Sequence, residues 1–126
     1  MKTARERFAL YAVTDRARAR SSGELLAQVA AAIRGGAGIV QLREKELPFG
    51  EFLREAEEFV ALCRSLGALS IINDNVEIAR LTGADGVHVG QEDMAAARAR
   101  ELLGPGRLIG VSAHTVEEAR AAYEMG

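Results

Sequence analysis

The stretch Gln41-Leu42-Arg43-Glu44-Lys45 decides how the rest of this sequence is interpreted. It continues the apolar residues 37–40, which begin a predicted buried strand. Because strand side chains alternate between two faces, we expect Gln41, Arg43 and Lys45 on one face and Leu42 on the other. An amide and two cations suit a site that binds anionic oxygens. The alternative is a strand end that emerges into water with its charges solvated, and these residues alone leave both interpretations open.

The composition is that of one globular domain. The chain has 126 residues, of which 48% are hydrophobic, and a formal net charge of -2. This length builds one core and is too short for two, so we expect a single domain over residues 1–126. The small net charge gives no general attraction to nucleic acid or to an anionic membrane. An aromatic content of 5% with no Trp also argues against a base-stacking surface.

The cellular location is expected to be the cytoplasm. Cys63 is the single cysteine, so no internal disulfide forms, and this is typical of a reducing compartment. The first residues are charged and lack the apolar stretch of a signal peptide. No apolar run approaches the length of a membrane span.

The chain alternates predicted strands with predicted helices. We expect strands at residues 8–13, 38–43, 69–72, 86–89 and 108–111. Helical spacing of apolar residues fills the intervals, and the last helix runs from residue 115 to residue 125. Capping-box spacing begins two of these helices, at Ser21 and at Thr115. This alternation predicts an α/β fold with a parallel sheet and crossover helices.

Two parallel architectures compete, an open doubly wound sheet and a TIM (β/α)₈ barrel. Every predicted strand ends in polar or small residues, which favours a barrel, because barrel sites gather at the carboxyl ends of several strands. A doubly wound sheet concentrates its site at one switch point, and its glycine-rich phosphate loop is missing after the first strand. We therefore expect an incomplete barrel of about five βα units.

Two aspartates are candidate metal ligands. Asp74 and Asp93 each follow a predicted strand. Mg²⁺ often takes one or two carboxylates together with substrate phosphates and water, and Arg43 and Lys45 would complete a pyrophosphate clamp. The alternative is that each aspartate only caps the following helix, which is a common role for Asp. Taken with the two cations, the pair favours Mg²⁺.

His88, Ser112 and His114 are candidate residues of the pocket. His88 lies between Val87 and Val89, so it is expected to face the barrel interior, where a hydrogen-bonded core histidine is the alternative. Ser112 and His114 are two residues apart and are expected to point the same way. They could hydrogen-bond a ligand or merely finish the strand.

A family resemblance rests on motifs that extend over essentially the whole chain. Their pattern resembles the thiamine phosphate synthase family. The Gln41 motif and Gln91-Glu92-Asp93 favour the synthases over the related thiazole tautomerases, which share the barrel. The motifs are Leu10-Tyr11-Ala12-Val13-Thr14-Asp15, Gln41-Leu42-Arg43-Glu44-Lys45, Ile72-Asn73-Asp74, the run of residues 83–93, and Ile109-Gly110-Val111-Ser112-Ala113-His114-Thr115.

The resemblance implies a transferase reaction in thiamine biosynthesis. Hydroxymethylpyrimidine pyrophosphate loses pyrophosphate, and the nitrogen of a thiazole phosphate takes its place. The resemblance also implies roles for individual residues, with Arg43, Lys45 and Ser112 catalytic. The pyrophosphate end is assigned to Gln41, Arg43, Lys45 and Asn73, the Mg²⁺ ion to Asp74 and Asp93, and the lining of the pocket to His88 and Ser112.

The chain departs from the family after its fifth predicted strand. The resemblance implies three further strands, which carry a threonine and a lysine for pyrophosphate and a glycine-rich loop for the thiazole phosphate. Because open sheet edges pair with other chains, we expect the 126 residues alone to be oligomeric, aggregated or unstable, and not to make thiamine phosphate. Two alternatives are a thiazole tautomerase-like enzyme and a non-catalytic partial barrel that binds phosphate.

Overall fold

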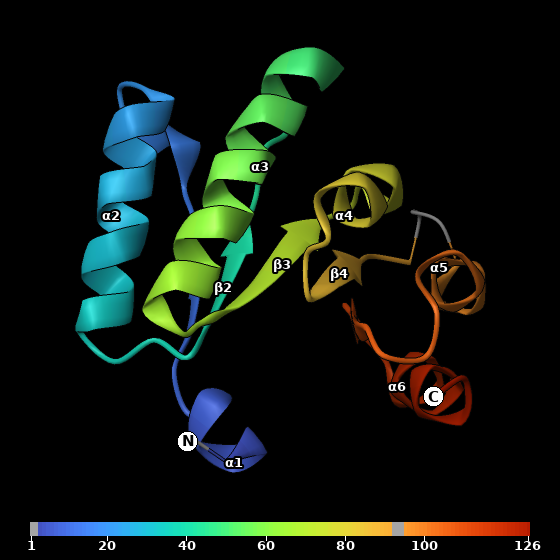
Figure 1. Ribbon diagram of the computed structural model, residues 1–126. Helices are drawn as coiled ribbons and strands as arrows, with labels where there is room; N and C mark the ends of the chain where they lie inside the picture. Colours follow the sequence, from blue (N-terminus) through green and yellow to red (C-terminus); the bar gives the residue numbers. More distant parts are fainter. Residues whose placement is uncertain (1–2, 92–94) are drawn as a thin grey trace.

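The computed structural model describes residues 3–91 and 95–126. Its strands form one parallel five-stranded sheet, and Figure 1 shows the helices that connect them. The strands are β1 (Tyr11–Val13), β2 (Ile39–Leu42), β3 (Leu69–Asn73), β4 (Gly86–Val89) and β5 (Leu108–Val111). The helical elements are α1 (Ala4–Arg7), the 3₁₀ turn η1 (Arg16–Arg18), α2 (Ser22–Arg34), α3 (Phe49–Leu66), α4 (Val76–Thr82), α5 (Ala96–Leu103) and α6 (Val116–Glu124).

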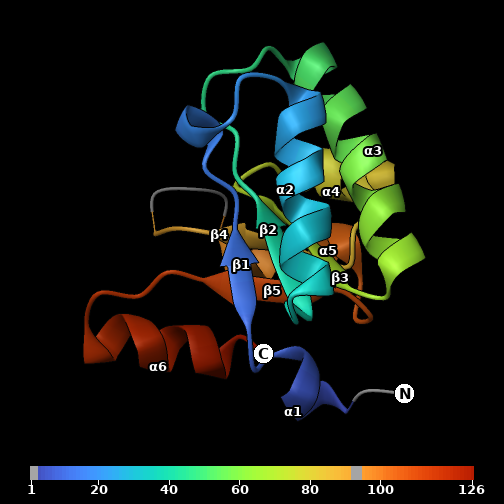
Figure 2. The ribbon, with the colours of Figure 1, turned by 90° about the vertical axis from the view of Figure 1, so that its left-hand side faces the viewer.

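The strand order confirms barrel-type units. The strands pair in the order β1-β2-β3-β4-β5, and every neighbouring pair is parallel. A doubly wound sheet reverses direction at its switch point, whereas each strand here is added on the same side of the previous one. Figures 1 and 2 show α2 and α3 side by side along the sheet. The described fold is therefore an incomplete (β/α) barrel.

The apolar core lies between the sheet and its helices. Val40, Leu42, Ile72 and Val87 of the strands pack there with Phe59 of α3, and all are buried. The alternate residues of the same strands face the inside of the partial barrel. On the outer strand β1 two of these, Tyr11 and Val13, are 39% and 51% exposed. The pleat of the sheet thus separates a packed face from an open one.

Side-chain caps begin three of the helices. Ser21 Oγ accepts from the Glu24 N–H at 3.1 Å, Asn75 Oδ1 from the Ile78 N–H at 2.9 Å, and Thr115 Oγ1 from the Glu118 N–H at 3.1 Å. Each bond satisfies a backbone donor that has no partner inside its helix. These caps fix where α2, α4 and α6 begin, whereas α3 and α5 begin without a side-chain cap.

The first strand is shorter than the predicted 8–13. Thr3 and Glu6 form reciprocal backbone-to-side-chain hydrogen bonds of 3.2 Å, which stabilise α1, and the Ala9 N–H then donates to the Glu6 carbonyl. Residues 8–10 are used in the turn that leaves α1, so β1 begins only at Tyr11. None of the described helices has the length and apolar character needed to cross a membrane.

Candidate functional site

The carboxyl ends of all five strands surround one hollow of about 600 Å³. Every predicted site residue that the structure describes lies in its wall, as the strand-end argument predicts. Asp93 lies outside the described residues. The lining residues are Tyr11, Val13, Gln41, Arg43, Lys45, Asn73, Asp74, His88, Gly90, Ser112 and His114.

A chain of hydrogen bonds crosses the floor of the hollow. Asn73 Nδ2 donates to Gln41 Oε1 at 2.7 Å, and Gln41 Nε2 donates to Tyr11 Oη at 3.0 Å. Gln41 and Asn73 are only 6% and 7% exposed. The side-chain oxygen of Asn73, Oδ1, is buried and has no partner among the described residues. A buried acceptor of this kind is costly when unpaired, so it fits a hydrogen-bond donor supplied by a ligand.

Burial acts on Tyr11 as well. It raises the pKa of the Tyr11 phenol, and the hydrogen bond from Gln41 opposes this shift in part. The phenol is therefore neutral at physiological pH and keeps its O–H as a donor.

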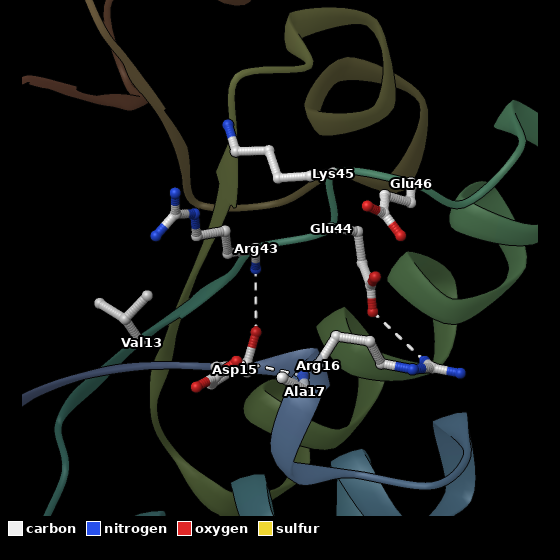
Figure 3. Close-up of a pocket in the computed structure, with 9 residues that line it drawn as sticks. Val13, Asp15, Arg16, Ala17, Arg43, Glu44, Lys45 and Glu46 are labelled. Carbon is white, nitrogen blue, oxygen red and sulfur yellow. Dashed lines mark hydrogen bonds and ion pairs between the residues drawn. The ribbon is translucent and has the colours of Figure 1, made fainter.

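Arg43 and Lys45 extend from the end of β2 toward the same side. Figure 3 shows both side chains pointing away from η1, while Glu44 between them points toward Arg16. The Arg43 N–H donates to Thr14 Oγ1 at 2.9 Å, which holds the strand end in place. Both cations are exposed to solvent. Because they are already exposed at the surface, they can bind an anionic ligand without a large further desolvation cost.

Asp74 lies next to Lys45 in the wall of the hollow. The Lys45 ammonium forms an ion pair with the Asp74 carboxylate, and the Asp74 N–H donates to the His88 carbonyl at 2.7 Å. Asn75 supplies the cap of α4, so the alternative that Asp74 is only a helix cap is wrong. Asp74 has a φ of 66°, a left-handed conformation that costs energy in a non-glycine residue. The strained backbone of Asp74 thus holds this carboxylate at the mouth of the hollow.

The donor set at Asp74 fits Mg²⁺ in part. Mg²⁺ takes hard oxygen ligands and commonly shares one or two carboxylates with substrate phosphates. No cluster of three His, Cys, Asp or Glu side chains suited to a metal occurs in residues 3–91 and 95–126. Within that part of the chain Asp74 is the carboxylate that lines the hollow. A metal here would depend on Asp74 and on the oxygens of its ligand.

His88 and Ser112 continue the wall on β4 and at the end of β5, with His88 the strand neighbour of Asn73. His88 Nε2 and Ser112 Oγ are 2.7 Å apart, and Gln91 Nε2 donates to the Ser112 carbonyl at 2.8 Å. Gly110 makes room for the imidazole, because a Cβ there would lie 2.5 Å from His88 Nδ1. The His114 N–H donates to Glu118 Oε1 at 2.7 Å, so His114 is held at the start of α6.

Two features of the site were missed by sequence reasoning. Tyr11 could have been found, because it lies two residues before Val13 and alternation places both on the inner face. An ionic group of Arg16 with the buried Glu44 and Glu55 gave no local signal. In the sequence, Glu44 lies 28 residues from Arg16 and Glu55 lies 39 residues from it.

The fold and the site define a class, an incomplete (β/α) barrel whose strand ends carry cations, amides and a carboxylate at one mouth. The chain belongs to the thiamine monophosphate synthase family, whose model matches residues 10–126. It is 50% identical over 113 residues to the thiamine-phosphate synthase of Solidesulfovibrio magneticus, covering 90% of this chain and 53% of that protein. It is 49% identical over 118 residues to a chloroplastic thiamine biosynthetic bifunctional enzyme of Arabidopsis thaliana, covering 93% of this chain and 23% of that protein.

A solved structure agrees with the family assignment. The thiamine phosphate pyrophosphorylase of Pyrococcus furiosus matches with a TM-score of 0.87 at 35% sequence identity. The match covers 98% of this chain and 59% of that one. The chain thus spans about half the length of the single-function relatives that it matches.

Proposed function

We propose that this chain carries the pyrimidine half of a thiamine phosphate synthase site. Its substrate would be hydroxymethylpyrimidine pyrophosphate, which gives up pyrophosphate as the nitrogen of a thiazole phosphate bonds to the pyrimidine methylene. The observation that carries the proposal is the convergence of Arg43, Lys45 and Asp74 at one mouth. Family membership supports the same reaction.

The described side chains suit the departure of pyrophosphate. Negative charge accumulates on the leaving oxygens as the carbon–oxygen bond breaks, and preorganised cations stabilise it. Arg43 can hold two phosphate oxygens with its forked guanidinium group. Lys45 can leave its ion pair with Asp74 and bind a third phosphate oxygen. Asn73 and Gln41 fix the floor beneath them. Ser112, oriented by His88, would contact the reacting end of the pyrimidine.

Mg²⁺ is the proposed cofactor. Asp74 and Asp93 would hold it together with pyrophosphate oxygens, and it would neutralise charge on the leaving group. Asn73 Oδ1, which lacks a partner within residues 3–91 and 95–126, would accept a hydrogen bond from a bound water or from the ligand.

The proposal extends to location and assembly. The single cysteine is buried, which suits a reducing cytoplasm. β1 and β5 are the outer strands of the sheet, and exposed strand edges pair with other chains. We therefore expect self-association of the 126 residues, measurable by light scattering. A monomer at high concentration would contradict that expectation.

The test combines binding with turnover. Calorimetry should show pyrophosphate binding that strengthens with Mg²⁺, and Arg43→Ala should weaken it by about tenfold or more. Arg98→Ala is the matched control, because Arg98 is exposed on α5 and pairs with Glu101. An equal loss in both variants would contradict the proposal.

A turnover assay separates the remaining functions. Supplying the pyrimidine pyrophosphate with thiazole phosphate and adding a C-terminal half from a relative tests the synthase. Binding without any pyrimidine turnover would indicate a phosphate-binding partial barrel. Conversion of a thiazole tautomer without pyrimidine would indicate a tautomerase.

A further inference from the structure

A partly buried ionic cluster lies on the other side of the β2 strand end from the two cations of the mouth. It consists of Arg16, Ser22, Glu44 and Glu55 and joins η1, α2 and α3 to the end of β2. Arg16 Nη1 lies 3.3 Å from Glu44 Oε1 and 2.7 Å from Glu55 Oε2. Ser22 donates its hydroxyl to the Glu55 carboxylate. The side chains of Glu44 and Glu55 are only 2% and 1% exposed.

The charges in this cluster do not balance. A single guanidinium nitrogen serves two buried carboxylates, so with both ionised the cluster carries a net negative charge in a poorly solvated place. Glu55 Oε1 is buried and lacks a partner among the described residues. A proton held between the two carboxyl groups would remove the excess charge and supply an O–H donor.

The pKa of Glu44 agrees with this geometry. Burial raises it from the ordinary value of 4.5 to about 7, the neighbouring Glu55 adds to the shift, and Arg16 opposes it. Glu44 and Glu55 both pair with Arg16 Nη1, so a proton on Glu44 is held beside the Glu55 carboxylate.

The position of Glu44 connects the cluster to the mouth. Figure 3 shows Glu44 pointing to Arg16 while its neighbours in sequence, Arg43 and Lys45, point the opposite way. The same backbone segment is therefore anchored on one side by the cluster and presents cations on the other.

We propose that Glu44 is a positioning residue for Arg43 and Lys45, and that the Glu44–Glu55 pair holds one proton whose loss weakens anion binding at the mouth. This inference rests on the proposed function for the identity of the anion. Losing the proton adds a buried negative charge one residue from both cations. By linkage, an anion bound at the mouth favours retention of the proton.

Other charged groups near the pair are exposed. Water screens them far more than the buried pair, so their titration is expected to matter less. They are Glu51, Arg54 and Glu58 on α3, Lys45 and Glu46 in the loop after β2, and Asp15 before η1.

The experiment compares anion affinity at pH 6 and pH 8. The probe is inorganic pyrophosphate without Mg²⁺, measured by calorimetry on the 126-residue chain. Glu44→Gln keeps the shape of the protonated side chain, and Glu46→Gln removes an exposed glutamate from the same loop as the matched control. The ionisation of pyrophosphate itself cancels when variants are compared at one pH.

We expect the Glu44→Gln chain and the wild-type chain to bind alike at pH 6. At pH 8 the variant should bind more tightly by about fivefold. Near pH 7, pyrophosphate binding to the wild type should also be coupled to uptake of a fraction of a proton. This uptake is measured as a dependence of the binding enthalpy on the ionisation enthalpy of the buffer, and Glu44→Gln should lack it. Glu46→Gln should follow the wild type throughout. Glu44→Ala should bind more weakly at both pH values, because it also removes the anchor.

The outcomes separate the two proposals. Pyrophosphate binding with the same pH response in wild type and Glu44→Gln overturns the inference and leaves the proposed function intact. Absence of pyrophosphate binding at both pH values overturns the proposed function and the coupling together.

Unfolding tests the shared proton independently of any ligand. Because folding raises the pKa of Glu44, the protonated Glu44 carboxyl group stabilises the folded state. This stabilisation is fully present below pH 4.5 and is lost as the pH rises through about 7. The melting temperature of the wild type should therefore fall relative to Glu44→Gln between pH 5 and pH 8. Parallel curves would contradict the shared proton. Glu55→Gln removes the other carboxylate and should abolish the same pH response.

Discussion

The two faces of the sheet show how one set of strands divides stability from binding. On the helix side, Leu42 and Ile72 are fully buried in the apolar core. One residue further along each strand, Arg43 and Asn73 lie in the wall of the hollow. The pleat alone produces this division, since successive side chains point to opposite faces. Adjacent residues can therefore be changed to test one face at a time.

The largest expected effect is on the core face. Leu42→Ala should cost about 2–5 kcal/mol of unfolding free energy, because it leaves a cavity at a side chain with no exposed surface. Arg43→Ala, one residue away and exposed, should change stability by about 0.5 kcal/mol or less. Denaturant unfolding of both variants checks the contrast. Similar losses in the two would mean that the faces are not separated.

The next effect is on the anion site. Lys45→Met should weaken pyrophosphate binding by about tenfold, because it removes the point charge and keeps most of the aliphatic chain. Arg43→Lys should also weaken binding, since the charge remains and the fork is lost. Calorimetry at fixed ionic strength measures both. Unchanged affinity in Lys45→Met would contradict the proposed role of the ion-paired lysine.

A smaller and diagnostic effect concerns the metal. Asp74→Ala and Asp93→Ala should each reduce the Mg²⁺-dependent part of pyrophosphate binding, and the double variant should lose less than the sum, because both act on one ion. Identical pyrophosphate affinities of the wild type with and without Mg²⁺ would contradict the proposed role of the metal.

The backbone at Asp74 provides a control for folding. Asp74→Gly should be more stable than Asp74→Ala by about 1 kcal/mol, because glycine adopts the φ of 66° without strain. Thermal unfolding compares the two, and an equal stability would show that the left-handed backbone is not costly here.

The smallest effect on binding is expected at Cys63. This thiol lies on the core side with no exposed surface, and burial raises its pKa to about 12. Cys63→Ala should leave pyrophosphate affinity unchanged while costing about 1 kcal/mol of stability. A thiol reagent should label Cys63 only after unfolding. Rapid labelling of the folded chain would place the residue elsewhere.

Much of the fold followed from local sequence patterns. Alternating strands and helices predicted parallel βα units, and polar strand ends predicted where the site lies. The caps at Ser21 and Thr115 are where the capping spacing indicated. At residues 8–10 the apolar pattern indicated a strand, but hydrogen bonds within and after α1 use those residues in a turn.

Other features depend on contacts that the sequence does not display. Asp74 and Asn75 are both good cap residues, and the structure shows that Asn75 is the cap while Asp74 takes a left-handed backbone. Arg16 meets Glu44 and Glu55 across long sequence separations, so no motif reveals the cluster. Local patterns thus predicted the faces of the strands, while tertiary packing determined the ionic partners.

The central claim is that the inner face of the sheet at the strand ends binds the pyrophosphate group. Amide NMR spectra recorded with and without Mg²⁺-pyrophosphate test this most directly. We predict shifts concentrated at the residues of the hollow, namely Gln41, Arg43, Lys45, Asn73, Asp74, His88 and Ser112, with much smaller changes in the middle of α2 and α3. Shifts confined to the helix side, or none at saturating ligand, would contradict the account.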